Sequence, residues 1–334
     1  MQLRHQRLKQ AAFGTKERVM ANAQNDKKAL GYALAAVLLW STVASAFKIT
    51  LQYLTPLQMV AAASCVSFLF LFAVMLYQGR LPEILPELKK YPLYYLCLGL
   101  LNPLVYYLVL FQAYTLLPAS QAQPLNYTWA IALTLMAAIF LGQKIRKRDW
   151  VACAFGYLGV LVIATQGNLL ALEFTSGPGV ALALISTFLW AGYWILNTRH
   201  QTDAVLTLLI CFLVSLPFSL GASFIFTDWS GIPWQGWAAV TYVGLFEMGL
   251  TFVLWLNAMK LATNTAKISN LIFISPFISL MLLAFIIGET IYPATIFGLL
   301  LIIFGLLVQQ WRRRTTVAGE PRPRIGSGVF SKRK

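Results

Sequence analysis

The sequence is poor in charged residues. Only 11% of its 334 residues are charged, whereas 59% are hydrophobic. A soluble chain of this length could not cover its surface with so few charged side chains. Histidine and cysteine are also scarce, because the chain has two histidines, His5 and His200, and four cysteines without a CxxC spacing. Such a chain lacks the side-chain clusters that metal sites and most membrane enzymes use, so we expect no metal and no cofactor.

Long apolar runs make up most of the chain. They extend over about 20 residues, enough for a helix to cross roughly 30 Å of hydrocarbon, and they lack the alternation of a barrel strand. We predict an all-α integral membrane fold with ten transmembrane helices. Their predicted limits are 29–50, 57–78, 92–114, 119–141, 150–166, 178–198, 204–226, 236–258, 264–287 and 292–311. Residues 1–28 and 312–334 remain as basic tails, and the second is expected to be disordered.

The beginning of the chain allows two interpretations besides a first span that follows a tail. The apolar run Leu30–Trp40 with Ala44–Ala46 after it is similar to a signal peptide with its cleavage site. However, the polar leader is long and the apolar run continues past that site, so we interpret it as a retained span. Met20 is an alternative start position, which would place residues 1–19 outside the protein.

Positive charge falls on one side of the predicted topology. With the N-terminus in the cytoplasm, all but two of the 26 lysines and arginines lie on cytoplasmic segments. The two others are Lys48, near the outer end of the first span, and Lys267, within the ninth. This pattern follows the positive-inside rule and predicts that both termini are cytoplasmic. We expect the basic tails to contact anionic lipid and not nucleic acid, because no folded domain accompanies their charge.

The second half of the chain repeats the first. Leu141–Ile145 aligns with Ile287–Ile291 at a shift of 146, and Phe111–Tyr114 aligns with Leu256–Met259 at a shift of 145. Each half holds five predicted spans, so the second copy must be inverted in the membrane. Inverted repeats are typical of secondary transporters, which bind their substrates near the midplane. The two halves comprise residues 29–166 and 178–311.

Paired residues near the middle of the spans are the first candidates for a site. Trp40 aligns with Trp190 at a shift of 150, and Asn102 aligns with Glu247 at a shift of 145. A carboxylate at this depth must face protein or a water-filled cavity. Glu247 is therefore either a site residue that exchanges a proton or a hydrogen-bonded structural glutamate. Lys267 is either a cation in the cavity or a side chain that extends to the cytoplasmic interface.

Spans 4 and 9 are polar and contain prolines. Pro124 and Pro276 free backbone carbonyls, and such breaks are tolerated where a helix lines a cavity. We predict that Pro276 acts as a hinge. The predicted substrate-binding residues are Trp40, Asn102, Gln121, Trp129, Trp190, Tyr193, Glu247, Trp255, Lys267 and Asn270, and Glu247 is also the predicted coupling residue.

Trp40-Ser41 and Trp190-Ala191 begin the two halves, and Gly142-Gln143 and Gly288-Glu289 follow the fourth span of each. In these motifs the chain resembles the EamA-type members of the drug/metabolite transporter superfamily. The resemblance covers about residues 29–311. It implies two five-span halves around a central cavity, a bacterial inner-membrane location, and export of amino acids or other small metabolites. The chain departs from the family pattern at Gln143, where a glutamate is common.

These observations together predict a secondary transporter that works by alternating access around a midplane cavity. We expect it to export a small metabolite such as an amino acid, with a proton exchanged at Glu247. A channel-like permease and an integral membrane enzyme are the alternatives. The expected partners are a small solute, membrane lipid and protons, and no oligomeric state follows from the sequence.

Overall fold

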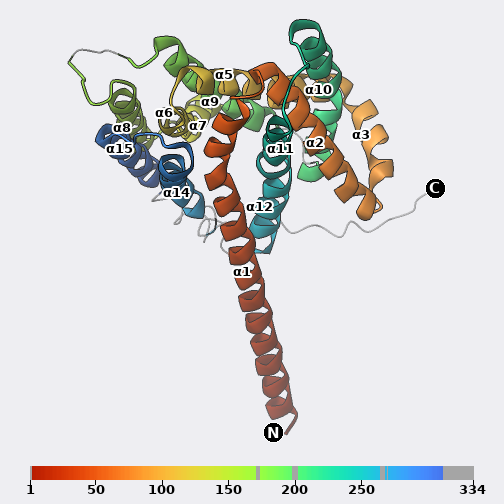
Figure 1. The fold of residues 1–334 in the computed structure, drawn as a ribbon. Helices are drawn as coiled ribbons and strands as arrows, with labels where there is room; N and C mark the ends of the chain where they lie inside the picture. The colour runs from red at the N-terminus through yellow and green to blue at the C-terminus, as the bar shows by residue number, and fades with distance from the viewer. Residues whose placement is uncertain (1, 171–173, 198–201, 264–267, 269, 311–334) are drawn as a thin grey trace.

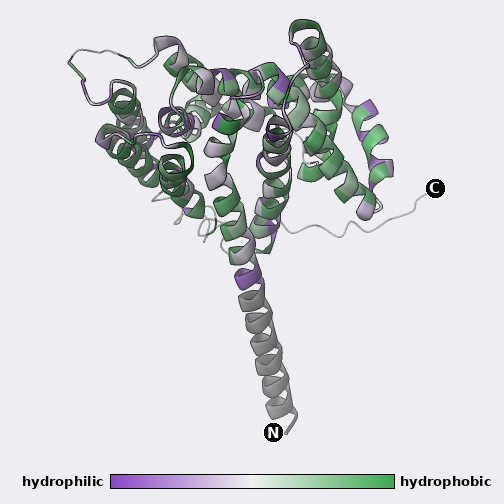
Figure 2. Cartoon of the chain, in the orientation of Figure 1, coloured by the Kyte–Doolittle hydropathy of each residue, from purple (hydrophilic) through white to green (hydrophobic). Residues whose placement is uncertain are grey.

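The chain folds into a bundle of helices. A computed structural model describes residues 2–170, 174–197, 202–263, 268 and 270–310, and this part contains no β-strand. Eight helical segments are long and apolar enough to cross a membrane, and hydrophobic residues, green in Figure 2, predominate along the helices of the bundle. They are Asn25–Thr50, Pro56–Tyr77, Pro92–Leu116, Ala119–Leu141, Gly177–Asn197, Ala204–Phe226, Trp234–Leu261 and Asn270–Ile287.

Several of these segments are built from more than one helix. The helices are α1 (Gln2–Thr50), α2 (Pro56–Tyr77), α3 (Ile84–Lys90), α4 (Pro92–Gly99), α5 (Tyr106–Leu116), α6 (Ala119–Asn126), α7 (Trp129–Leu141), α8 (Lys147–Ala164), α9 (Gly177–Asn197), α10 (Ala204–Phe226), α11 (Trp234–Tyr242), α12 (Leu250–Leu261), α14 (Ser275–Leu282) and α15 (Pro293–Gln310). The predicted tail 1–28 is helical from Gln2, and α1 extends out of the bundle at its N-terminal end (Figure 1).

The remaining two predicted spans, α8 and α15, do not meet the length and hydropathy that the other eight meet. They occupy equivalent places, as the fifth helix of each half, and they pack closely against each other. A Cβ at Gly159 would lie 2.5 Å from the carbonyl oxygen of Gly298, so only glycine permits this approach. Eight spans are thus supported by length and composition, and the count of ten stays a prediction.

The bundle has two polar ends, which we name after one residue on each. The Asp203 face carries Arg80, Asp203 and Lys260, and Asp26 of α1 accepts hydrogen bonds from Thr263 there. The Glu289 face carries Lys48 and Glu289. Helix α1 therefore runs from the Asp203 face to the Glu289 face.

Helix α9, the first of the second half, runs in the opposite direction. Thr175, just before α9, accepts a hydrogen bond from Gln121 of α6, whose first amides bind Glu289. Asp203, just after α9, lies on the other face. The first helices of the two halves are therefore antiparallel.

The two halves interlock. Helix α1 packs against α12, and α9 packs against α5, so the first helix of each half contacts the third span of the other. Helix α2 also packs against α10, so the second helices of the two halves contact each other. A site in the middle of the bundle must therefore draw its residues from both halves.

Both third spans break at equivalent positions. A π-helical turn, η2 (Leu100–Val105), separates α4 from α5, and Asn102 within it has extended backbone angles (φ −144°, ψ 118°). A second π-helical turn, η3 (Val243–Glu247), separates α11 from α12 and ends at Glu247. These breaks were not predicted from the sequence, although Pro103 marks the first and Gly249, with φ −117° and ψ −90°, follows the second.

Spans 4 and 9 are interrupted, as their prolines predict. Helix α6 ends at Asn126 before α7 begins at Trp129. In span 9 the 3-10 turn η4 (Asn270–Ile274) precedes α14, with Pro276 in its first turn, and the π-helical turn η5 (Leu283–Ile287) follows it.

Candidate solute-binding site

Seven aromatic rings from four helices form a continuous group near the middle of the bundle. Phe252 of α12 lies between two tryptophans, with its ring centroid 5.6 Å from that of Trp40 and 6.3 Å from that of Trp190. The Trp255 ring is 5.5 Å from Trp40. We call these seven rings the central cluster; its members are Trp40, Tyr106, Tyr107, Trp190, Tyr193, Phe252 and Trp255. Trp194 and Phe111 extend the ring contacts beyond it.

Trp190 connects the aromatic residues of α5 and α9. Its ring is 4.7 Å from Tyr106 and stacks on Tyr193 at 5.4 Å. Trp40 and Trp190, which the repeat alignment pairs, therefore lie in one group and are joined through Phe252. Aromatic contacts of this kind add to the stability that burial alone provides.

Glu247 lies at the edge of the central cluster. The Tyr107 hydroxyl donates a hydrogen bond to its carboxylate over 3.2 Å. The side chain is half-buried and lies in the middle of its span. A carboxylate at this depth is expected to face protein or a cavity.

Asn102, the residue aligned with Glu247, is buried beside the Tyr193 hydroxyl. Its side-chain oxygen has no hydrogen-bond partner among the described residues. A buried polar atom without a partner is unfavourable, which makes it a position where a bound solute or water could donate. Asn102 and Glu247 thus reach the same aromatic group, one through Tyr193 and the other through Tyr107.

The chemistry of this group suits a small solute with an apolar body. Aromatic faces and a carboxylate together stabilise a positive charge such as an ammonium group, and aromatic side chains are common partners of the apolar atoms of a ligand. In the described part of the chain, no three histidine, cysteine or acidic side chains come together as metal ligands would.

Comparison with known proteins agrees with this architecture. The model of the EamA-like transporter family matches residues 27–165 and 177–309, which are the two halves. The chain belongs to the EamA-like transporter family. It is a membrane transporter, and the alternative of an integral membrane enzyme is thereby set aside.

Curated relatives of this EamA-like transporter are themselves named as transporters. It is 24% identical over 243 residues to the uncharacterized transporter YyaM of Bacillus subtilis, covering 66% of this chain and 74% of the relative. It is also 24% identical over 297 residues to the uncharacterized inner membrane transporter YedA of Escherichia coli K12, covering 83% and 89%. A crystal structure that shares 22% identity superposes with a TM-score of 0.62 over 86% of this chain and 98% of the other, which shows a common fold.

The structure places the other predicted site residues of this EamA-like transporter in different surroundings. Gln121 hydrogen-bonds to Thr175 near the Glu289 face, away from the middle of the span. Trp129 is half-buried at the start of α7, and none of the ring contacts among described residues includes it. Asn270 begins η4 and has a buried side-chain oxygen without a partner in the described part of the chain. Lys267 lies outside the described residues.

Sequence reasoning missed Tyr106, Tyr107 and Phe252, the residues that connect the predicted ones. Tyr106 is buried, and its hydroxyl lies 3.5 Å from the Asn126 side-chain oxygen. The Asn126 amide in turn donates a hydrogen bond to the Ser186 hydroxyl. The available signal was their position in the turn after each break. Tyr107 and Phe252 align at the same shift of 145 as Asn102 and Glu247.

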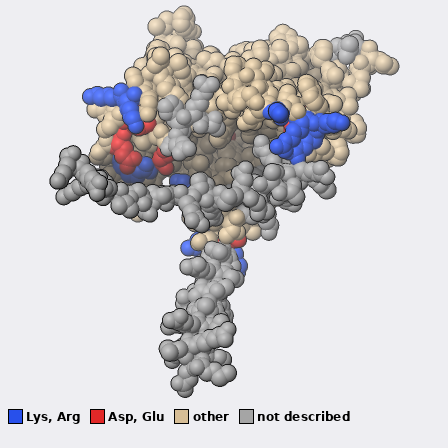
Figure 3. All heavy atoms as spheres, turned by 180° about the vertical axis from the view of Figure 1, so that it is seen from behind, with Lys and Arg blue, Asp and Glu red and all other residues tan. Residues whose placement is uncertain are grey.

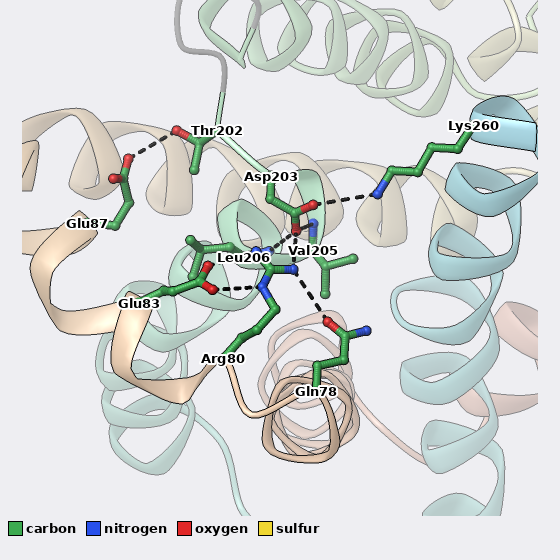
Figure 4. A network of polar contacts seen from close by, with 9 residues as sticks. All are labelled: Gln78, Arg80, Glu83, Glu87, Thr202, Asp203, Val205, Leu206 and Lys260. Carbon is green, nitrogen blue, oxygen red and sulfur yellow. Dashed lines mark hydrogen bonds and ion pairs between the residues drawn. The ribbon is translucent and has the colours of Figure 1, made fainter.

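A second polar group lies on the Asp203 face (Figure 4). Asp203 accepts hydrogen bonds from the backbone amides of Val205 and Leu206 at the start of α10. It also pairs with Arg80 at 3.4 Å and with Lys260 at 3.6 Å. This network ties the loop after α2 to the ends of α10 and α12, and therefore joins the two halves.

Most of the charge on this side of the molecule lies in two groups, apart from a few charged side chains where α1 leaves the bundle. Figure 3 shows one of acids and bases next to α3 and another of bases at the beginning of α8, with a recessed surface between them. A pocket of about 630 Å³ beside α3 is lined by Arg80, Lys90, Asp203 and other residues. None of its lining residues belongs to the central cluster, so this pocket is separate from the candidate site.

Proposed function

We propose that this EamA-like transporter is a secondary carrier that exports a small metabolite, such as an amino acid, by alternating access around the central cluster. The observation that carries the proposal is the contact of Tyr107 with Glu247, which joins the broken third spans of the two halves. Broken helices that meet at mid-depth are a common way to build a transporter site.

We further propose ten spans, arranged as two inverted five-helix repeats, with α8 and α15 as the fifth helices. The antiparallel course of α1 and α9 and the crossed packing of the halves support this arrangement. The Asp203 face would be cytoplasmic, because Arg80, Lys90 and Lys260 lie on it and positive charge favours that side. The relative YedA is named an inner membrane transporter, which supports an inner-membrane location for this chain.

Glu247 would bind a proton and the solute in turn. An ionised carboxylate at this depth is unfavourable until a proton or a cationic group neutralises it. The two halves could therefore reorient when Glu247 holds a proton or the ammonium group of a solute, and not when it is empty. The result is an exchange in which a proton enters the cell as the solute leaves.

The test is a flux measurement in proteoliposomes with an imposed pH gradient. Wild-type protein should show saturable, pH-driven flux of an amino acid such as radiolabelled L-alanine, L-leucine or L-tyrosine. Glu247→Gln should lose the dependence on pH, since the amide cannot exchange a proton. Glu83→Gln is the matched control, because it removes a carboxylate on the exposed Asp203 face.

Three outcomes would contradict the proposal. One is unchanged pH-driven flux in Glu247→Gln. Another is equal loss in Glu83→Gln. The third is a rate that rises linearly with solute concentration, since a channel would behave in this way and an alternating carrier would saturate.

A further inference from the structure

Two opposite charges hold the corner between α5 and α6 on the Glu289 face. The Lys48 ammonium donates to the carbonyl oxygens of Tyr114 and Leu117, both at 2.8 Å. The Glu289 carboxylate accepts from the backbone amides of Ala119 and Ser120, both at 2.9 Å. The positive charge thus stabilises the C-terminal end of α5, and the negative charge stabilises the N-terminal end of α6.

Both charged side chains also line one pocket. Its volume is about 370 Å³, within the range of sites for small molecules. Although Lys48 and Glu289 share this space, no ion pair within 4.0 Å joins them. The pocket therefore presents a positive group and a negative group with a space between them.

Each charged group can still form another hydrogen bond. An ammonium group has three donors, and Lys48 uses two of them on backbone carbonyls. Each carboxylate oxygen has two lone pairs, and each oxygen of Glu289 accepts from one backbone amide. A solute could thus be bound without releasing the α5–α6 corner.

We propose that this pocket is a second solute site, which binds the zwitterionic main chain of an α-amino acid. The solute carboxylate would lie against Lys48 and its ammonium group against Glu289. A purely cationic amine would be repelled by Lys48 and a purely anionic acid by Glu289, so neither should bind as well. The site goes beyond the central cluster, and its existence does not require the proposed exchange mechanism.

The repeat supports a site on one face only. Glu289 aligns with Gln143, which is exposed and carries no charge. The equivalent position in the first half therefore lacks the acid that would bind an ammonium group. An amino acid would be held at the Glu289 face, where an exported solute leaves if this face is the outer one.

A cysteine-protection measurement tests the site without any flux. Thr115 lines the pocket and is exposed, so Thr115→Cys should react with a maleimide on the purified full-length protein. The rate is followed by mass spectrometry of the peptide that contains residue 115, because Cys97 is also exposed. The probes are L-alanine, ethylamine and propionate, which have similar bodies and differ in charge.

L-Alanine should slow the labelling about threefold at twice its Kd, whereas ethylamine and propionate at the same concentration should not. Tyr53→Cys is the matched control, because Tyr53 is exposed on the same face outside the pocket lining, and its labelling should not change. Adding Glu289→Gln or Lys48→Met to Thr115→Cys should abolish the protection. Adding Glu247→Gln should retain it, which separates this site from the central cluster.

The proposal is overturned if L-alanine gives no protection, if the amine or the acid protects equally, or if protection survives both charge substitutions. Where a charge variant fails to fold, as shown by its thermal unfolding, the selectivity among the three probes on Thr115→Cys decides. A failure of pH-driven flux would leave this result unaffected, because the labelling needs no gradient.

Discussion

Tyr107 and Glu247 are joined by a hydrogen bond of 3.2 Å between the two halves of the transporter. The repeat alignment pairs Tyr107 with Phe252 and Asn102 with Glu247, all at a shift of 145. The two halves therefore have the same backbone break and different chemistry after it. One half supplies an amide and a phenol, and the other supplies a carboxylate and a phenyl ring. The hydrogen bond forms because Tyr107 of one half and Glu247 of the other lie next to each other in the middle of the bundle.

Tyr107→Phe should weaken transport through Glu247. It removes a hydrogen bond to a charged group, worth about 1.5–3 kcal/mol, and retains the ring that contacts Tyr106 and Phe111. We expect proteoliposome flux to fall about tenfold or more. Because the two residues act together, Tyr107→Phe combined with Glu247→Gln should be no worse than Glu247→Gln alone. Multiplicative losses would show that they act independently.

Trp40 should matter for its ring and not for its indole nitrogen. Trp40→Phe retains an aromatic face next to Phe252 and Trp255, whereas Trp40→Ala removes it. We expect the alanine variant to raise the KM for transport by about tenfold, equivalent to about 1.4 kcal/mol, and the phenylalanine variant to raise it much less. Trp150→Ala is a suitable control, because that side chain is 60% exposed. Equal effects of Trp40→Phe and Trp40→Ala would contradict this role.

Asp203 should make the stability of the protein depend on pH in acid. Burial alone would raise the pKa of Asp203, but the Leu206 amide and the charges of Arg80 and Lys260 hold it below its ordinary value. A carboxyl with a lowered folded-state pKa contributes fully above its unfolded pKa of about 3.9, and loses that contribution as the pH falls through the folded value. Its effect should therefore be constant from about pH 5 to 8.

Substitutions at Asp203 separate its two roles. Asp203→Asn retains an acceptor for the start of α10 and loses the ion pairs, which should reduce stability by about 0.5–1 kcal/mol at pH 7. Asp203→Ala should cost about 1 kcal/mol more, because the helix cap is lost as well. Thermal unfolding in detergent at pH 7 and pH 3 is the measurement. A difference between wild type and Asp203→Asn that does not shrink at pH 3 would contradict the assignment.

Gly159→Ala should separate α8 from α15. The added Cβ would lie 2.5 Å from the Gly298 carbonyl oxygen, and such overpacking costs about 1–3 kcal/mol. Gly221→Ala in α10 is the matched control, since nothing lies within 4 Å of its Cβ position and alanine favours a helix by about 0.5–1 kcal/mol over glycine. Thermal unfolding should therefore move in opposite directions for the two variants. Similar shifts would indicate that the helices can move apart freely.

Most of the membrane-spanning helices could be predicted from the sequence, whereas the candidate site could be predicted only in part. Trp40, Trp190, Asn102 and Glu247 were recognised because a repeat pairs them, and the structure places all four in or beside one aromatic group. Gln121 was chosen because it belongs to a polar stretch of span 4. It lies near the start of that span, however, and therefore near the Glu289 face. Composition identifies a polar helix, whereas only the position of its ends shows how deep each side chain lies.

Apolar runs, the 146-residue shift and the one-sided charge already determined a membrane protein with two related halves, because those properties are local or periodic along the chain. The tertiary structure decided how the halves interlock, that Tyr107 meets Glu247, and that Lys48 and Glu289 share a pocket. These relationships connect residues more than one hundred positions apart. They arise from helix packing and from breaks in the helices. Both depend on contacts between distant segments, which a local sequence pattern does not contain.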